Sequence, residues 1–435
     1  MKAAILTLGC KSNQADSQAL AAILEDKGYE IVPWPERADL YVINTCTVTA
    51  ASDRQSRQAL RQAIRRNPDA LIVATGCYAQ TSPQALASLG QADLILGNQE
   101  KFELPRFLET QRKGRPPLVV AGQIDRGQSL SPFPIPHRLP RTRPLLKIQD
   151  GCEGECTYCI VPRARGPQRS LPPVAVKRKL AELIERGFRE VVLTGIRLGA
   201  YGADLPNWSD LAGLLRQLRS IPGHWRLRLS SLEPQDICPD LLRLWKEESR
   251  LCRHLHLPLQ SGDDDILARM GRPATVASYW GLMDNLIREV PGICLGADII
   301  VGFPGETERH FLRTYDFLTQ APLAYLHVFP FSPRPGTPAA SLPHAPSAAV
   351  KKERVQLLRS LAREKSFRFR SSFIGCSLEA LVLSPPHPTA PSYTALSDNY
   401  LPLLIEGGGK ELVGQLVRVE IQGFKEGILS ARWKE

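Results

Sequence analysis

Three cysteines on one short loop constrain this chain more than any other feature of its sequence. Cys152, Cys156 and Cys159 stand in the run from Gly151 to Cys159, with three residues between the first two and two between the last two. Three thiolates this close together can bind three corners of a cubane iron–sulfur cluster and leave the fourth iron without a protein ligand. The alternative, a zinc knuckle, needs a nearby fourth nitrogen or sulfur ligand, and no Cys or His follows until His224. The spacing therefore favours a cluster with one open iron.

A second set of cysteines follows the ends of predicted strands near the start of the chain. Cys10, Cys46 and Cys77 come just after the apolar runs 3–8, 40–44 and 71–76. In a parallel sheet the carboxyl ends of neighbouring strands lie along one edge, so we expect the three thiols to meet there. A single cysteine of this kind is usually a small buried hydrophobe. Three in the same topological position favour a second cluster, again with an open iron.

Strands and helices alternate over most of the sequence. Residues 1–121 show short apolar runs about thirty residues apart with helical sequence between them, which predicts a doubly wound parallel sheet in an α/β fold. A polar, proline-rich stretch, 122–143, is expected to be a linker. Residues 144–370 repeat the alternation with six strands, too few for a closed eight-stranded barrel, which predicts an open partial (β/α)6 barrel with its site at the carboxyl rim. Residues 371–435 contain shorter strands and predict a small all-β barrel.

Composition indicates where such a chain works and what it binds. Its 435 residues are enough for two or three domains. No apolar run approaches the roughly 18 residues of a membrane span, and the apolar start is too short for a secretory signal, so we expect a cytoplasmic protein without a membrane partner. The formal net charge of +11 points to an anionic partner.

One predicted helix carries a stripe of positive charge. Arg57, Arg61 and Arg65 follow one another at intervals of four residues, with Arg54 one step before them, and so share a helix face. No ladder of acidic residues stands at matching i±4 positions to neutralise the whole stripe. It is either a solvated face or a surface that follows nucleic acid phosphates, and we name Arg57, Arg61 and Arg65 as RNA-binding candidates.

Several motifs together resemble those of the methylthiotransferase family of radical S-adenosylmethionine (SAM) enzymes, over essentially the whole chain. They are Leu8-Gly9-Cys10-Lys11-Ser12-Asn13-Gln14, Asn44-Thr45-Cys46-Thr47-Val48-Thr49, Thr75-Gly76-Cys77-Tyr78-Ala79-Gln80, Ala164-Arg165-Gly166-Pro167, Leu257-Pro258-Leu259-Gln260-Ser261-Gly262 and Asp298-Ile299-Ile300-Val301-Gly302-Phe303-Pro304-Gly305-Glu306-Thr307. The residues around Cys10 and Cys46 are most similar to those of the branch that acts on N6-threonylcarbamoyladenosine beside the tRNA anticodon. The resemblance implies a C-terminal TRAM domain and a chain that works as a monomer.

The resemblance also implies cofactors and partners. Two [4Fe–4S] clusters are expected, one on Cys10, Cys46 and Cys77 and the SAM-binding one on Cys152, Cys156 and Cys159. Contacts to SAM are expected from Tyr158, Thr194, Gly195, Glu233 and Gln260, and no catalytic side chain is assigned. Partners would be the anticodon stem-loop of tRNA, an electron donor such as flavodoxin or ferredoxin, and a sulfur donor. In such an enzyme a SAM-derived radical would activate adenine C2 at position 37, and the other cluster would carry the sulfur.

Other functions stay open at this point. The same chemistry could act on N6-isopentenyladenosine of tRNA or on an aspartate of a ribosomal protein. A different class would be a metal-stabilised RNA-binding protein without catalysis, although paired sites that each lack a fourth ligand do not suit it. In the small barrel, RNA contacts are expected from aromatic and basic side chains, with these candidates: Tyr393, Tyr400, Arg418, Phe424 and Lys425.

Overall fold

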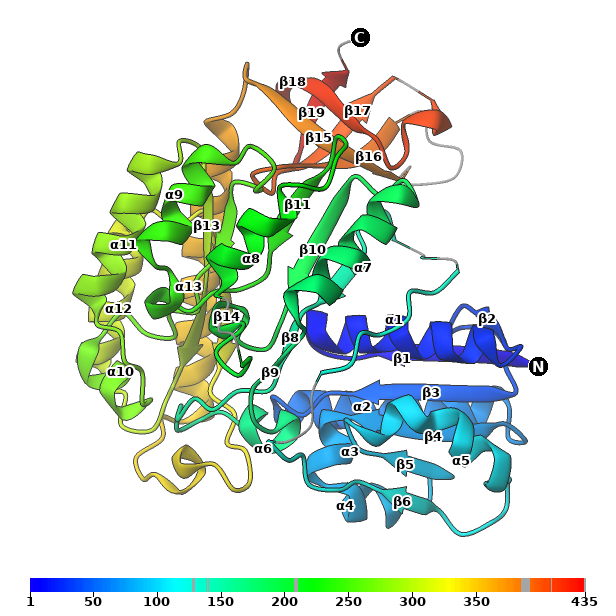
Figure 1. Cartoon of the computed structure of the whole chain (residues 1–435). Helices are drawn as coiled ribbons and strands as arrows, with labels where there is room; N and C mark the ends of the chain where they lie inside the picture. Colours follow the sequence, from blue (N-terminus) through cyan, green and yellow to red (C-terminus); the bar gives the residue numbers. More distant parts are fainter. Residues whose placement is uncertain are drawn as a thin grey trace. The chain divides into compact units, whose positions relative to one another are not determined.

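The computed structural model describes residues 1–126, 130–137, 139, 141–206, 210–384, 392–407 and 409–433 (Figure 1). The predicted linker 122–143 and the predicted C-terminal domain 371–435 thus lie partly outside the described residues. The chain forms two compact units, each built from separate stretches of sequence. The first unit comprises Met1–Leu139, Lys147–Leu171 and Ser332–Ala340, and the second comprises Pro140–Leu146, Pro172–Phe331 and Ser341–Glu435.

A six-stranded parallel sheet organises the first unit, in the order β2-β1-β3-β4-β5-β6. Its strands are β1 (Lys2–Thr7), β2 (Glu30–Val32), β3 (Leu40–Thr45), β4 (Leu71–Gly76), β5 (Leu94–Leu96) and β6 (Leu118–Val120). Neighbouring residues of a strand point to opposite faces: Leu40 and Val42 pack into one core cluster, Tyr41 and Ile43 into another. Both faces of the sheet are therefore buried, as the predicted doubly wound fold requires.

Helices cover the two faces. The cluster with Leu40 includes Leu20 and Leu24 of α1, and the cluster with Tyr41 includes Leu60 of α2. The helices of this part are α1 (Lys11–Asp26), α2 (Ala50–Arg66), α3 (Cys77–Thr81), α4 (Pro83–Ala87), η1 (Glu100–Glu103) and α5 (Leu104–Thr110).

A later stretch of chain completes the first unit. Strands β8 (Gln149–Asp150) and β9 (Arg169–Ser170) pair antiparallel and so bring together the two ends of the loop that carries the 152–159 cysteines. Helix α6 (Val161–Arg165) follows that loop and packs against α3. The loop is thereby fixed within the same unit as the six-stranded sheet.

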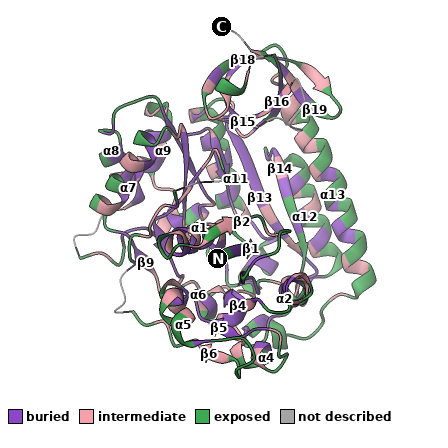
Figure 2. Cartoon of the chain, turned by 90° about the vertical axis from the view of Figure 1, so that its right-hand side faces the viewer, coloured by how far each residue is buried: buried purple, intermediate pink, exposed green. Residues whose placement is uncertain are grey.

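Two three-stranded sheets form the partial barrel of the second unit, in the orders β11-β10-β7 and β12-β13-β14. The strands are β7 (Leu145–Lys147), of which the last residue belongs to the first unit, β10 (Glu190–Thr194), β11 (Arg226–Leu229), β12 (His254–His256), β13 (Cys294–Val301) and β14 (Tyr325–Pro330). The helices are α7 (Pro173–Glu185), α8 (Leu211–Leu218), α9 (Pro239–Glu247), α10 (Asp264–Arg269), α11 (Val276–Glu289), α12 (Glu308–Gln320) and α13 (Ala348–Ser371). In Figure 2, β13 is mostly buried, whereas α12 and α13 present exposed faces.

A closed five-stranded barrel lies in the same unit, with strand order β15-β16-β17-β19-β18. Its strands are β15 (Ser377–Ser384), β16 (Ser392–Ser397), β17 (Pro402–Glu406), β18 (Leu416–Lys425) and β19 (Ile428–Trp433). Arg228 of β11 donates to the carbonyls of Ser397 and Asp398 at 2.9 Å each, and Arg226 donates to the Leu396 carbonyl at 2.8 Å. Glu190, itself buried, accepts from both arginines. The small barrel is thus joined to the larger one through buried charge.

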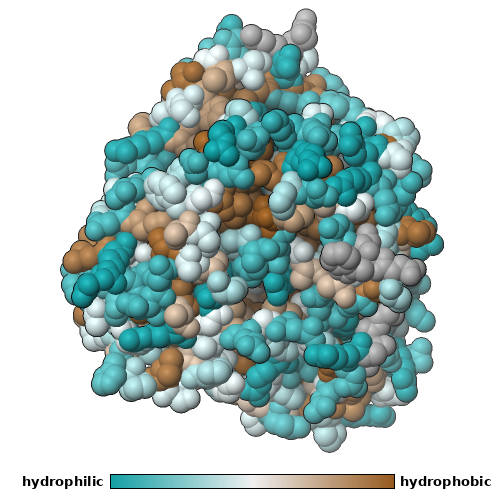
Figure 3. All heavy atoms as spheres, turned by 60° about the vertical axis from the view of Figure 1, so that its left-hand side comes forward, coloured by the Kyte–Doolittle hydropathy of each residue, from teal (hydrophilic) through white to brown (hydrophobic). Residues whose placement is uncertain are grey.

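The face shown in Figure 3 is largely hydrophilic, with hydrophobic residues in separate groups. Among the described residues, no helix combines the length and hydrophobicity needed to cross a membrane.

Candidate iron–sulfur centres

Cys10, Cys46 and Cys77 gather at the carboxyl edge of the six-stranded sheet, as expected. Cys10 caps α1 directly after β1, Cys46 follows β3, and Cys77 opens α3 after β4. These three strands are neighbours in register. A Cβ atom placed on Gly9 would lie only 2.7 Å from the Cys46 sulfur, which shows how closely the Cys10 and Cys46 loops approach. Of the three residues, Cys46 and Cys77 are buried and Cys10 is exposed.

Glycine is required before two of these cysteines. Gly9 and Gly76 have φ angles of +91° and +90°, a region that side chains with a Cβ atom rarely adopt. A Cβ on Gly76 would lie 2.4 Å from the Asn44 amide oxygen. The glycine that precedes Cys10 and the glycine that precedes Cys77 are therefore required by the backbone conformation at the ends of β1 and β4.

Asn13 ties the cysteine loops together. Its amide nitrogen donates to the carbonyls of Leu8 and Thr45, at 2.7 and 2.9 Å. Its amide oxygen accepts from Arg165 and lies 3.9 Å from the Cys77 sulfur. The asparagine in the motif around Cys10 thus fixes one cysteine loop to the next.

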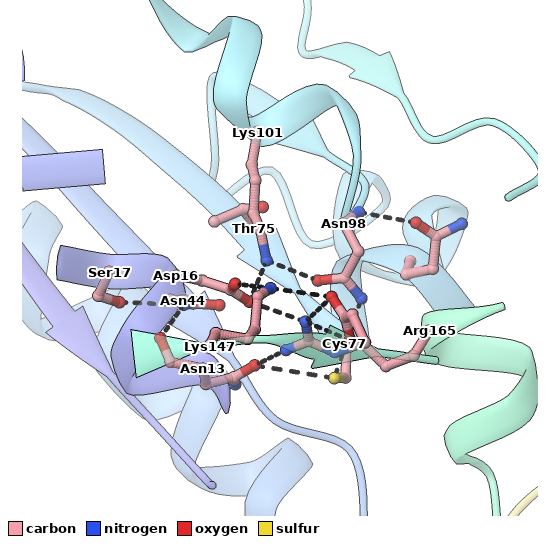
Figure 4. Close-up of polar contacts among 12 residues, drawn as sticks. Asn13, Asp16, Ser17, Asn44, Thr75, Cys77, Asn98, Lys101, Lys147 and Arg165 are labelled. Atoms are coloured by element: carbon pink, nitrogen blue, oxygen red, sulfur yellow. Dashed lines mark hydrogen bonds and ion pairs between the residues drawn. The ribbon is translucent and has the colours of Figure 1, made fainter. Parts of the chain in front are cut away.

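A network of buried charges lies beside these cysteines (Figure 4). Asp16 accepts from Lys101 at 2.6 Å and from Arg165 at 2.8 Å, and it also pairs with Lys147. Asp150 lies 2.9 Å from Lys147 and 3.1 Å from Arg165. All five side chains are at most 6% exposed. The sequence interpretation missed this network, because charged residues are rarely buried unless paired; the signal available was the Ala-Arg-Gly motif that contains Arg165.

The network shifts the acidity of its members. Burial alone would raise the pKa of Asp16, but Lys101, Lys147 and Arg165 outweigh it and hold that pKa well below its usual range. Burial lowers the pKa of Lys101 to about 8, against the opposing pull of Asp16. At neutral pH the pair is therefore ionised. Burial also raises the pKa of the Cys46 thiol to about 11, so a bound metal would have to displace its proton.

The second cysteine loop is held at its base. The Cys152 amide donates to the Gly166 carbonyl at 3.1 Å, and the Cys159 amide donates to the Cys156 carbonyl at 3.0 Å. The Gly154 amide donates to the Cys152 sulfur at 3.3 Å. Cys152, Cys156 and Cys159 are all half-buried. The loop therefore has a fixed backbone and sulfurs that a ligand can reach.

Neither cysteine triad has the spacing of a zinc site. Thiolates about 2.3 Å from one zinc ion lie about 3.8 Å from one another. Within the described chain, the sets of three or more potential ligands with all donor atoms within 4.8 Å are His256, Asp298 and His327, and Asp263, Asp265 and His310. Neither cysteine triad is among these sets, and three thiolates can instead bind separate irons of a cubane.

The expected SAM contacts fall in both units. Tyr158 is half-buried in the 152–159 loop. In the second unit, Thr194 ends β10 and Gly195 follows it, while Gln260 has a φ angle of +75° and joins β13 through its backbone. The Glu233 carboxylate accepts from Arg272, with one contact of 3.0 Å. This carboxylate is therefore already paired with another side chain of the same chain.

The expected RNA-binding side chains differ in exposure. Arg61 and Arg65 are exposed on α2, whereas Arg57 is half-buried and donates to the Tyr78 hydroxyl at 3.1 Å. In the small barrel, Tyr393 is buried in the core, so the expectation of base stacking by Tyr393 is wrong. Tyr400 stacks on His254 with ring centroids 4.1 Å apart. The candidates Arg418 and Lys425 are exposed, and Phe424 is half-buried.

Comparisons with known families agree with this arrangement. A family described as "Uncharacterized protein family UPF0004" matches residues 2–97, and the radical SAM superfamily matches residues 146–318. The first match contains Cys10, Cys46 and Cys77, and the second contains the 152–159 loop.

Curated relatives match nearly the full chain. The threonylcarbamoyladenosine tRNA methylthiotransferase MtaB of Aquifex aeolicus is 42% identical over 421 residues, covering 97% of this chain and 100% of the relative. MtaB of Bacillus subtilis is 37% identical over 418 residues, covering 95% and 92%. A tRNA-2-methylthio-N(6)-dimethylallyladenosine synthase of Moorella thermoacetica is 35% identical over 428 residues, covering 96% and 95%.

A solved structure supports the fold. The radical SAM methyltransferase TsrM of Kitasatospora setae superposes with a TM-score of 0.57 over 78% of this chain and 75% of that chain, at 17% identity. The superfamily match and the curated relatives together define a radical SAM enzyme that modifies tRNA. The full-length relatives go further: the chain belongs to the methylthiotransferase family, in its MtaB branch.

Proposed function

We propose that this enzyme converts N6-threonylcarbamoyladenosine at position 37 of tRNA to its 2-methylthio derivative. The observation that carries the proposal is the identity of 42% with the Aquifex aeolicus MtaB over essentially both full lengths. The relative named for N6-dimethylallyladenosine is 35% identical, so the group on the adenine nitrogen is the feature an experiment has to decide.

The second cluster is part of the proposal, and the residues present fit it. Cys10, Cys46 and Cys77 offer three thiolates at one sheet edge, the ligand type that iron–sulfur clusters take. Ser12, two residues beyond Cys10, has a buried hydroxyl that finds no hydrogen-bond partner in the described part of the chain. A cluster sulfide in this place would supply an acceptor for such a donor.

The chemistry explains why two cysteine triads are useful. The adenine C2–H bond is unactivated, and the cluster on the 152–159 loop with SAM supplies a carbon radical that can take its hydrogen atom. The protein's task is to position substrate and cofactors and to exclude water. We assign SAM contacts to Tyr158, Thr194, Gly195 and Gln260, and to Glu233 through the carboxylate that Arg272 orients.

The proposed reaction also implies binding partners. The exposed Arg61 and Arg65 of α2 would contact phosphates of the anticodon stem-loop, with Arg57 contributing from its half-buried position. An electron donor such as flavodoxin or ferredoxin would reduce the SAM cluster, and a sulfur donor would supply the transferred atom. We propose that the enzyme acts as a monomer in the cytoplasm.

Mass spectrometry of tRNA nucleosides tests the substrate. A strain lacking the enzyme should accumulate N6-threonylcarbamoyladenosine without its 2-methylthio form, and the wild-type gene should restore that form. Loss of the 2-methylthio form of N6-isopentenyladenosine instead would replace the proposed substrate by the alternative one. A normal tRNA profile would leave a ribosomal-protein target to be tested.

Iron analysis tests the clusters separately. The anaerobically reconstituted chain should hold about eight irons, as two cubane clusters require. Replacing Cys10, Cys46 and Cys77 by Ala should halve this content, abolish thiolation and leave SAM cleavage intact. Replacing Cys152, Cys156 and Cys159 by Ala should also halve it but abolish SAM cleavage. An unchanged iron content in the first variant would contradict the second cluster.

A further inference from the structure

The buried charges beside Cys10 and Cys77 are not balanced. The network holds two carboxylates, Asp16 and Asp150, and three direct cationic partners, Lys101, Lys147 and Arg165. Arg169 adds a fourth cation, 3.9 Å from Asp150. All six side chains are at most 7% exposed. The network therefore carries two positive charges more than negative ones, in a place that solvent barely reaches.

Such an excess needs a counter-charge. Burying an unpaired ion costs several kcal/mol even after relaxation, and the Nε atoms of Arg165 and Arg169 are buried without an acceptor among the residues that the structure describes. The second unit handles a similar excess differently: Arg226 and Arg228 share Glu190 and also donate to main-chain carbonyls, and Arg226 lies 3.7 Å from the Glu379 carboxylate. Beside the cysteines, the Nε donors of Arg165 and Arg169 have no such acceptor among the described residues.

Two asparagines connect the cations to Cys77. The Asn13 amide oxygen accepts from Arg165 and lies 3.9 Å from the Cys77 sulfur. The Asn98 amide oxygen accepts from Lys101 at 2.9 Å, and its nitrogen lies 3.9 Å from the same sulfur (Figure 4). The positive charge therefore lies one side chain away from a predicted cluster ligand.

We propose that Lys101 and Arg165, with their network, are the counter-charge of the cluster on Cys10, Cys46 and Cys77 and raise its reduction potential. This inference rests on the second cluster of the proposed function. Three thiolates on a dicationic cubane core leave one negative charge, and reduction adds another, so nearby buried cations favour the reduced state. Both side chains act as positioning and electrostatic residues, since neither is a ligand.

A matched pair of lysine variants tests the charge effect. The measurement uses the full-length chain with Cys152, Cys156 and Cys159 replaced by Ala, so that one cluster is observed in a redox titration. Lys101→Met should lower the equilibrium constant for reduction at least tenfold, or 59 mV for one electron. The control is Lys113→Met: Lys113 also pairs with an aspartate, Asp93, but is 40% exposed. Asp93 stands at the amino end of β5, whereas the cysteines follow the carboxyl ends of their strands. In this control variant the equilibrium constant for reduction should stay within twofold of the parent's.

Two arginine variants separate charge from packing. Arg165→Lys keeps the charge but cannot reach Asn13, Asp16 and Asp150 together, so it should destabilise the protein and leave the potential close to the parent value. Arg165→Gln removes the charge and should lower the potential in the same direction as Lys101→Met. Equal shifts in the two arginine variants would show a packing effect and overturn the proposal.

The same experiment keeps the two proposals apart. If the Cys152, Cys156 and Cys159 triple variant binds no iron after reconstitution, the second cluster of the proposed function fails. If it holds about four irons and Lys101→Met has the same potential as Lys113→Met, the second cluster stands and the counter-charge proposal alone is refuted.

Discussion

Replacing Asp16 by Asn should destabilise the first unit more than any conservative change on its surface. Asp16 is fully buried and pairs with Lys101, Lys147 and Arg165. In the variant, Lys147 and Arg165 retain Asp150, at 2.9 and 3.1 Å. Lys101 retains only the Asn98 amide oxygen, at 2.9 Å, among its contacts in the network. One lysine is therefore left without a counter-ion.

The expected loss of stability follows from the one charge, on Lys101, that is left without a carboxylate partner. Removing one partner of a buried ion pair costs about 3 to 5 kcal/mol, and the surviving asparagine contact places this change at the lower end, about 3 kcal/mol. For a unit of this size, the melting temperature should fall by about 6 to 12 °C in scanning calorimetry. Asp39→Asn is the control, because Asp39 is exposed in the same unit and should change stability by less than about 0.5 kcal/mol.

The pH dependence gives the argument a second check. The pKa of Lys101 is lowered from 10.5 to about 8 in the folded protein, so between these values the unfolded chain binds the extra proton and stability rises with pH. Without Asp16, the folded pKa drops further, and this rise should begin at a lower pH. The destabilisation should therefore shrink as pH goes from 7 to 9. Equal melting temperatures for Asp16→Asn and Asp39→Asn would refute the reasoning.

Three further changes test other parts of the structure. Gly9→Ala should remove about half of the iron, because its methyl group would lie 2.7 Å from the nearest cysteine sulfur. The control, Gly28→Ala, has a similar φ angle of +81° and no atom within 4 Å of the new methyl group, so it should retain the iron. Equal iron contents in the two variants would refute the steric argument. The double change Arg61→Ala and Arg65→Ala should lower the slope of log K for tRNA against log salt by roughly 1.4 to 1.8, and an unchanged slope in a binding titration would make α2 a solvated face. Glu190→Gln should strand two buried arginines and cost about 3 kcal/mol or more, seen as faster proteolytic release of the small barrel; wild-type resistance would count against that role.

The positions of the cysteines could be predicted because they follow from topology. Strand ends in a parallel sheet share an edge, so Cys10, Cys46 and Cys77 could be placed together without any knowledge of their contacts. The predicted sheet and partial barrel are confirmed for the same reason. The start of helix α1 at Lys11 carries no capping signal in the sequence, because Cys10 caps the helix without a side-chain hydrogen bond.

Short or locally ambiguous elements escaped prediction. Strands β2 and β6 have three residues each, too few to show a period. The charge network was hidden for a different reason: Asp16, Lys101 and Arg165 lie far apart in sequence, and nothing local distinguishes a buried charge from a solvated one.

The division of the first unit among three stretches of chain has a consequence for its synthesis. Lys147, Asp150 and Arg165 leave the ribosome after the six-stranded sheet. Arg334, which donates to Thr47 at 2.8 Å and pairs with Asp53, comes roughly 170 residues after Arg165. At about 5 to 20 residues per second, that interval is about 9 to 34 s. Until Lys147 and Arg165 have been synthesised, the nascent N-terminal sheet carries Asp16 with Lys101 as its one available partner in the network. The sheet therefore cannot reach its final state as an independent early domain, and iron loading at Cys10, Cys46 and Cys77 is expected only after the distant segments have docked.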